Sequence, residues 1–97
     1  MILHTLNDSP ASAAYRDCLA LLQPGDALVL MGDAVYAALE GTQSHSELAG
    51  LKDIGVFALA EDMRMAGVPV IAPGVQAIGM EELVRLTEQY PRQQAWY

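Results

Sequence analysis

The sequence contains one cysteine, Cys18, and this scarcity limits the chemistry available to the protein. A single cysteine excludes an intrachain disulfide and a cluster of thiolate metal ligands, and it is typical of a reducing cytoplasm. Basic side chains are also few: five Lys and Arg residues stand against twelve Asp and Glu residues, and the net charge is −7. Because a surface of this sign repels phosphate backbones, direct binding of nucleic acid by this chain is disfavoured.

Long hydrophobic runs are absent as well. No apolar run approaches the roughly 20 residues that a membrane helix needs, so we expect no membrane span. The first apolar residues, Ile2 and Leu3, are soon followed by His4, Asn7 and Asp8, which is not the pattern of a signal-peptide core. The sequence therefore predicts a soluble, cytoplasmic protein.

Several motifs that bind cofactors or carry catalysis are missing. No G-x-G-x-x-G, Walker-type loop or G-x-S-x-G occurs, so no nucleotide cofactor is expected. His4 and His45 are far apart along the chain, so their spacing indicates no shared metal and each is expected to make hydrogen bonds. The acidic pairs at positions 61–62 and 81–82 are adjacent residues that diverge on a helix, so they do not form a general acid and base.

What the sequence does have is apolar side chains. Hydrophobic residues make up 53% of the chain and charged residues 18%, which is a large apolar share for a body of 97 residues. A chain of this length supports one core, so we predict a single domain over residues 1–97. Some apolar side chains are then left over for the surface, and we expect an oligomer.

Apolar runs alternate with helical patterns along the chain. The continuous runs at 27–31 and 54–60 are typical of strands that are covered on both faces, as in parallel sheets. The predicted strands are 1–6, 27–31, 54–60 and 70–73, the predicted helices are 11–22, 35–39, 61–67 and 80–90, and 41–50 is a polar loop or short helix. This order predicts an α/β fold, a small three-layer α/β/α sandwich around a mostly parallel sheet of four to five strands. No element is assigned to the tail after Pro91.

The dipeptide Gly32-Asp33 interrupts two apolar runs at the carboxyl end of a predicted strand. In one interpretation Asp33 caps the helix that begins near Val35, which contributes about 1 kcal/mol. In the other, Asp33 borders the crevice that opens at the carboxyl ends of parallel strands and meets a ligand or partner there. The two interpretations are compatible.

Cys18 has two interpretations. As a thiol it is a candidate nucleophile or sulfur carrier. It also falls on the same helical stripe as Ala14 and Leu21, where a cysteine is usually a small core residue. The neighbouring Asp17 disfavours a thiolate, although Arg16 is adjacent on the other side. The pattern favours the core interpretation.

Four stretches follow one another along the chain: “ILHTLNDSP”, “PGDALVLMGDAVYAAL”, “VFALAEDMRMAG” and “LVRLTEQYPRQQAW”. Together with the Gln-Gln-x-Trp ending at residues 93–96, they resemble the TusB/DsrH family of sulfur-relay proteins. The resemblance runs nearly from end to end. Each motif alone is weakly specific, but four motifs in the same order and with similar spacing identify the family.

The resemblance implies the small DsrEFH-type, flavodoxin-like α/β fold and a place in a heterohexamer with two copies each of three related chains. The other two chains are TusC/DsrF-like and TusD/DsrE-like. In the Tus branch, the complex takes persulfide sulfur from a TusA-like carrier and passes it through a TusE-like protein toward 2-thiolation of the wobble uridine of certain tRNAs. In the Dsr branch, the analogous complex serves sulfur oxidation.

The resemblance also bears on single residues. The principal sulfur-carrying cysteine of the family belongs to the TusD/DsrE-like chain, so this chain resembles an accessory subunit without an active site of its own. Some DsrH-like members have a cysteine in the first helix, at the place of Cys18, which makes it a candidate persulfide carrier. The family commonly has Gln-Asp-Gly where this chain has Gly32-Asp33-Ala34, and Asp-Tyr where it has Gly79-Met80. Both departures bear on docking.

The leading hypothesis is therefore a binding subunit whose crevice edge at Asp33, Val35 and Tyr36 packs against related chains. The first alternative is a sulfurtransferase that carries a persulfide on Cys18, and the second is an unrelated flavodoxin-like domain that binds a small ligand. In isolation, the same apolar surface is available for a homo-oligomer.

Overall fold

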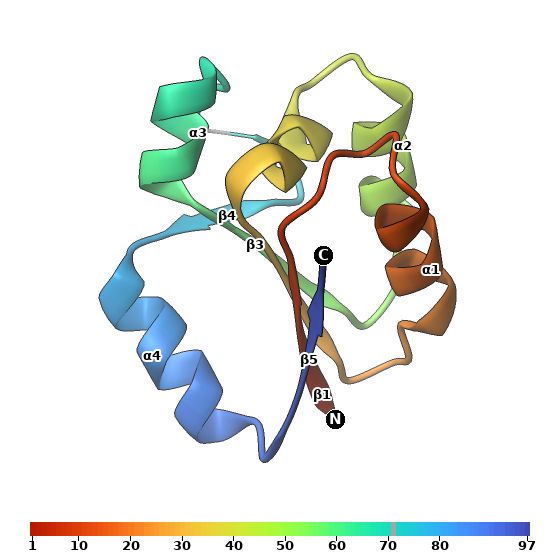
Figure 1. The fold of residues 1–97 in the computed structure, drawn as a ribbon, viewed down its shortest axis with the longest axis vertical. Coiled ribbons are helices and arrows are strands. Elements are labelled where there is room, and N and C mark those ends of the chain that lie inside the picture. Colours follow the sequence, from red (N-terminus) through yellow and green to blue (C-terminus); the bar gives the residue numbers. More distant parts are fainter. Residues whose placement is uncertain (71) are drawn as a thin grey trace.

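Five parallel strands form the sheet of the computed structural model, which describes residues 1–70 and 72–97 (Figure 1). Their order across the sheet is β4-β3-β2-β1-β5. Along the chain, the elements are β1 (Ile2–Leu6), α1 (Ala13–Leu21), β2 (Ala27–Leu30), the 3₁₀ helix η1 (Gly32–Ala38), α2 (Gln43–Ala49), β3 (Gly55–Leu59), α3 (Ala60–Ala66), β4 (Gln76–Ile78), α4 (Met80–Gln89) and β5 (Arg92–Trp96). The predicted α/β class and the parallel sheet of four to five strands are confirmed.

The helices divide unequally between the two faces of the sheet. The chain steps from β1 to β4 in one direction and then returns past β1 to β5, so right-handed crossovers place α4 opposite the other helices. Figure 1 shows α4 by itself on one side of the sheet and α1 and α2 on the other. Tyr15 and Cys18 of α1 share one apolar core with η1, α2 and α3, whereas Leu83 of α4 belongs to the second core. The three predicted layers are present.

The strand β2 lies at the centre of this arrangement. It pairs with β1 on one side and with β3 on the other, and all four of its residues are buried. Both faces of β2 are covered, and this is why its sequence is a continuous apolar run instead of an alternating one. No helix among the described residues is long and apolar enough to cross a membrane.

The predicted strand at 70–73 is wrong in position. The structure describes a bend at Val70 and an isolated antiparallel bridge between Ala72 and Val75, and Ile71 lies outside the described residues. Pro73 and Gly74 occupy the middle of a tight turn that is closed by a hydrogen bond from Val75 N–H to Ala72 C=O (3.1 Å). With φ at +80°, Gly74 suits the third position of a type II turn. The sheet strand therefore begins only after the turn, at 76.

The C-terminal tail is a strand that the sequence did not predict. Residues 92–96 form β5, which pairs with β1 in parallel along its whole length, from Ile2 beside Arg92 to Leu6 beside Trp96. Four of its five side chains are exposed, because β5 is at the edge of the sheet. An edge strand of this kind carries no apolar alternation, and its sequence gives little signal.

The segment after β2 differs from the predicted helix at 35–39. A 3₁₀ helix begins at Gly32, and the separate helix α2 follows within the stretch predicted as a loop or short helix. The Thr42 hydroxyl caps α2 by accepting a hydrogen bond from His45 N–H (3.2 Å). A 3₁₀ helix has three residues per turn, so it turns different side chains toward the core than an α-helix does.

Candidate docking crevice and the polar network behind it

A crevice opens where β2 and β3 end and η1 and α3 begin. It has a volume of about 220 Å³ and is lined by Gly32, Asp33, Tyr36, Asp62, Met65 and Ala66. A second hollow of about 580 Å³ adjoins it at the ends of β3 and β4 and shares Asp62 with it. The crevice therefore lies at the carboxyl ends of the strands, where ligands and partners of parallel sheets commonly bind.

The carboxylate that orders the crevice is Asp62, not Asp33. Asp62 accepts a hydrogen bond from the backbone N–H of Gly32 (2.8 Å), which is one of the free donors at the start of η1. The residue before η1 is Met31, and no side chain caps this helix in the way that was predicted for Asp33. Among the described residues, the Asp33 side chain is exposed and takes part in no hydrogen bond.

Gly32 is required at the floor of the crevice. Its φ is +52°, a backbone conformation that favours glycine. A Cβ atom at this position would overlap the side-chain oxygen of Asn7. The backbone of Gly32 therefore approaches both Asn7 and Asp62, and a larger residue would be strained there and would push the Asn7 side chain aside.

The structure separates the three residues that were predicted for the crevice edge. Asp33 and Tyr36 line the crevice, and the Tyr36 side chain is 43% exposed. Val35 is completely buried in the core, so it does not line the crevice. Met65 of α3, which the sequence analysis did not single out, is 81% exposed at the same place. The 3₁₀ geometry of η1 explains why Val35 turns inward.

The crevice presents apolar and acidic groups and little else. Tyr36 and Met65 supply apolar surface, and Asp33 and Asp62 supply carboxylates. No group of three His, Cys, Asp or Glu side chains within the described part of the chain is arranged to hold a metal ion. A small, open site of this composition suits contact with another protein surface better than a reaction that needs a nucleophile.

The thiol of Cys18 is not arranged to carry sulfur in this conformation. Its side chain is completely buried within the core beneath α1. This burial raises the pKa of the thiol from 9.0 to about 12. Because the thiolate is the nucleophile, a buried thiol that stays protonated neither attacks a persulfide nor accepts sulfur from one.

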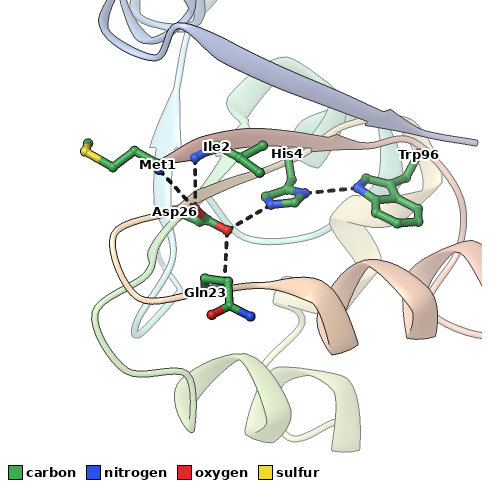
Figure 2. A network of polar contacts seen from close by, with 6 residues as sticks. All are labelled: Met1, Ile2, His4, Gln23, Asp26 and Trp96. Atoms are coloured by element: carbon green, nitrogen blue, oxygen red, sulfur yellow. Dashed lines mark hydrogen bonds and ion pairs between the residues drawn. The ribbon is translucent and has the colours of Figure 1, made fainter.

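A buried polar network lies at the other end of β2 and centres on Asp26 (Figure 2). The Asp26 side chain accepts hydrogen bonds from Ile2 N–H (2.8 Å) and Gln23 N–H (3.0 Å), and its Oδ2 atom is 3.1 Å from His4 Nε2. The N-terminal amine of Met1 lies 4.0 Å from Oδ1. Asp26 is only 3% exposed, so these groups replace the water that the carboxylate loses on burial.

These contacts decide the charge of Asp26. Burial by itself would raise the pKa of the carboxyl group. The hydrogen bonds from the backbone N–H groups of Gln23 and Ile2 and from His4 act in the opposite direction and together lower its pKa below the usual value. Asp26 is therefore a carboxylate at neutral pH, and it joins β1 to the turn before β2.

The second partner of His4 extends the network to the last strand. The indole N–H of Trp96 donates a hydrogen bond to His4 Nδ1 (3.1 Å), and the two rings lie 6.3 Å apart between centroids at an angle of 25°. A donor at Nδ1 leaves the proton of neutral His4 on Nε2, where it points at Asp26. These hydrogen bonds from Asp26 through His4 to Trp96 thus join the residue directly before β2 to β1 and β5 (Figure 2).

Sequence reasoning missed most of this network. It expected a hydrogen-bonding role for His4 but did not single out Asp26. His45 was also expected to make hydrogen bonds. Its Nε2 atom lies 2.7 Å from the carbonyl oxygen of Pro73. The available signal at Asp26 was an acidic residue directly before a fully apolar strand, a position where burial requires partners.

Comparisons with known proteins agree on the family that this chain resembles. A family model described as “DsrH like protein” matches residues 8–93. Protein TusB from Salmonella arizonae is 40% identical over 98 residues, covering 98% of this chain and all of the relative, and Protein TusB from Salmonella dublin is 39% identical over the same coverage.

Two solved structures share the fold. The Escherichia coli ychN protein is 21% identical with a TM-score of 0.77, and the alignment covers 97% of each chain. A protein of unknown function from Methanobacterium thermoautotrophicum is 19% identical with a TM-score of 0.63, covering 97% of this chain and 96% of that one. At these identities the likeness concerns the fold alone.

Proposed function

The chain belongs to the DsrH/TusB family, and we propose that it is an accessory subunit of a sulfur-relay complex, without an active site of its own. The observation that carries this proposal is the state of Cys18: the one thiol of the chain is buried, and its pKa is about 12. Sulfur transfer needs a reachable thiolate. The sulfur is therefore handled by a cysteine of another subunit, and this chain contributes binding surface.

The proposed complex is TusBCD-like. Its other subunits are TusC/DsrF-like and TusD/DsrE-like, and it exchanges persulfide sulfur with TusA- and TusE-like carriers in the cytoplasm. Relatives named Protein TusB match along their full length, which supports the Tus branch and hence 2-thiolation of the wobble uridine of tRNA. With a net charge of −7, this chain does not hold the tRNA itself.

The crevice at Asp33 and Tyr36 is the proposed docking site for a related subunit. Tyr36 and Met65 expose apolar surface there, and such side chains at a concave site are typical of the centre of a protein interface. In the complex, these side chains would be covered by a neighbouring subunit and would help to position its persulfide.

Coexpression with TusC-like and TusD-like chains tests the proposal. We expect the three chains to copurify as one assembly of defined mass in native mass spectrometry. A Met65→Glu substitution at the crevice should weaken that assembly, and the matched control Val84→Glu, at an exposed apolar position of α4, should not. If this chain stays alone in the presence of both partners, the proposal is wrong.

Sulfur loading distinguishes the proposal from a sulfurtransferase role for Cys18. After incubation of the assembly with a cysteine desulfurase and a TusA-like carrier, we expect added sulfur on the TusD-like subunit and none on Cys18. A Cys18→Ala variant should assemble and support tRNA thiolation as the unmodified chain does. Sulfur found on Cys18, together with loss of relay in Cys18→Ala, would establish the sulfurtransferase alternative instead.

The cellular readout separates the two branches of the family. Deletion of the gene should abolish 2-thiouridine at the wobble position of the affected tRNAs, and a plasmid copy should restore it. Unchanged tRNA thiolation combined with impaired sulfur oxidation would place the chain in the Dsr branch.

A further inference from the structure

Strand β5 is bound to the sheet along one side only, by its pairing with β1. It is the edge strand, and among residues 1–70 and 72–97 it pairs only with β1. The side chains of residues 92–95 are exposed, and Trp96 is the side chain of β5 that packs against the core. The carbonyl oxygen of Trp96 also accepts a hydrogen bond from Asn7 N–H (3.1 Å). Besides the pairing with β1, Trp96 is therefore the residue through which the C-terminal end of β5 contacts the core.

The indole of Trp96 restricts the protonation state of the histidine that binds it. Indole N–H is a donor only, so His4 must offer a lone pair at Nδ1 to accept it (3.1 Å). The other ring nitrogen, Nε2, faces the Asp26 carboxylate at 3.1 Å. Neutral His4, with its proton on Nε2, satisfies both neighbours at once. Figure 2 shows the two contacts of its ring.

We propose that His4 is a pH-sensitive latch: when Nδ1 takes up one proton from solvent, the hydrogen bond from Trp96 breaks and the Trp96 side chain is released from His4. After this proton uptake, both ring nitrogens carry hydrogen, and the indole N–H faces another N–H. The bond from Nε2 to Asp26 persists, and the carboxylate becomes the counter-charge of the imidazolium. The loss therefore falls entirely on the Trp96 side.

Few titratable groups lie around His4 in the part of the chain that the structure describes. The charged groups near His4 among the described residues are Asp26 and, behind it, the amine of Met1. On the buried side of α1, Tyr15 and Cys18 have pKa values raised to about 12 by burial, so both stay neutral. Histidine is the side chain whose charge ordinarily changes between about pH 5 and 8.

Nuclear magnetic resonance of the isotope-labelled full chain tests the latch. Because the protein has one tryptophan, its indole N–H gives a single resonance. From about pH 8 to about pH 5, we expect this resonance to shift with the same one-proton midpoint as the His4 imidazole, and its solvent exchange, corrected for pH, to accelerate about tenfold or more. An indole resonance that stays constant while His4 titrates, or a His4 that does not titrate in this range, would overturn the proposal.

Two variants assign the transition. The chain has two histidines, so His45→Gln should leave the transition of the indole resonance in place, and His4→Gln should remove it. If His4→Gln does not fold, the imidazole nitrogen shifts of the unmodified protein still report whether Nδ1 is the atom that gains the proton. Far-UV circular dichroism should stay constant through the transition, because a simultaneous loss of secondary structure would mean global unfolding and would contradict a local latch.

Discussion

An aspartate lies near each end of strand β2, and the two aspartates differ in burial and in hydrogen bonding. Asp26, directly before β2, is 3% exposed and binds Ile2, Gln23 and His4. Asp33, just after β2, is exposed and has no hydrogen bond among the described residues. The amino end of the sheet is thus closed by a polar network, and the carboxyl end is left open as a crevice.

This difference separates the end of the sheet that stabilises the fold from the end that is available to bind a partner. A buried carboxylate with several donors fixes the strands around it, because each donor would lose its partner if the carboxylate moved. An exposed carboxylate beside exposed apolar side chains contributes little to the fold. A partner can therefore use the crevice without disturbing the network at the other end of the sheet.

The largest expected effect comes from truncating the two aspartates in parallel. Asp26→Ala removes three hydrogen bonds and leaves buried donors unpaired, so we expect the free energy of unfolding to fall by about 3 kcal/mol or more. Asp33→Ala should change it by less than about 0.5 kcal/mol. Urea denaturation of the two variants measures both values. Equal losses at the two positions would show that the ends of β2 do not differ as described.

Lowering the pH should remove the stabilising contribution of Asp26. The folded-state pKa of Asp26 lies below its ordinary value, so as pH falls the unfolded chain binds a proton before the folded one does. The contribution of Asp26 to stability is therefore fully present above about pH 4 and is lost as pH falls through the lower, folded pKa. Urea midpoints of the unmodified protein and of Asp26→Asn should differ at neutral pH and converge in acid. A constant gap down to the lowest pH would contradict the role of the charge.

The sequence was sufficient for the fold where local patterns carry the information. The run 27–31 predicted a strand because a strand covered on both faces is apolar at every position. The prediction from sequence missed β5, since Arg92–Ala95 are exposed and their partner β1 is about ninety residues away in the chain. Pairing between such distant segments leaves no trace in local periodicity.

The sequence likewise predicted some residues of the candidate site correctly and missed others. Asp33 and Tyr36 were predicted at the crevice from their position after an apolar run, and they line it. Val35 was misplaced because the segment is a 3₁₀ helix, whose shorter turn rotates this side chain into the core. Asp26 was missed because its partners come from the first strand and from the loop before it, and a local pattern shows only the turn.

A smaller effect is expected at the far end of the network. Trp96→Phe keeps an aromatic ring but removes the indole N–H, so His4 Nδ1 loses its donor inside the protein. We expect a loss of about 1 to 2 kcal/mol in the free energy of unfolding. The control is Tyr97→Phe, which removes a polar atom from a residue that is 87% exposed and should be neutral. If the two variants are equally stable, the contact between Trp96 and His4 does not hold β5.

The smallest effect should appear at the open end, where it distinguishes two neighbouring carboxylates. Asp62 accepts the hydrogen bond from Gly32 N–H, so Asp62→Ala leaves that donor to solvent and should cost about 1 kcal/mol, the usual value of a helix cap. Asp33→Ala, only one residue from the same helix start, should cost almost nothing, because its side chain holds no backbone group among the described residues. Thermal unfolding of both variants at one pH is enough to rank them. The opposite ranking would return the cap to Asp33 and would make the exposed carboxylate of the crevice a structural residue instead of one that is free to meet a partner.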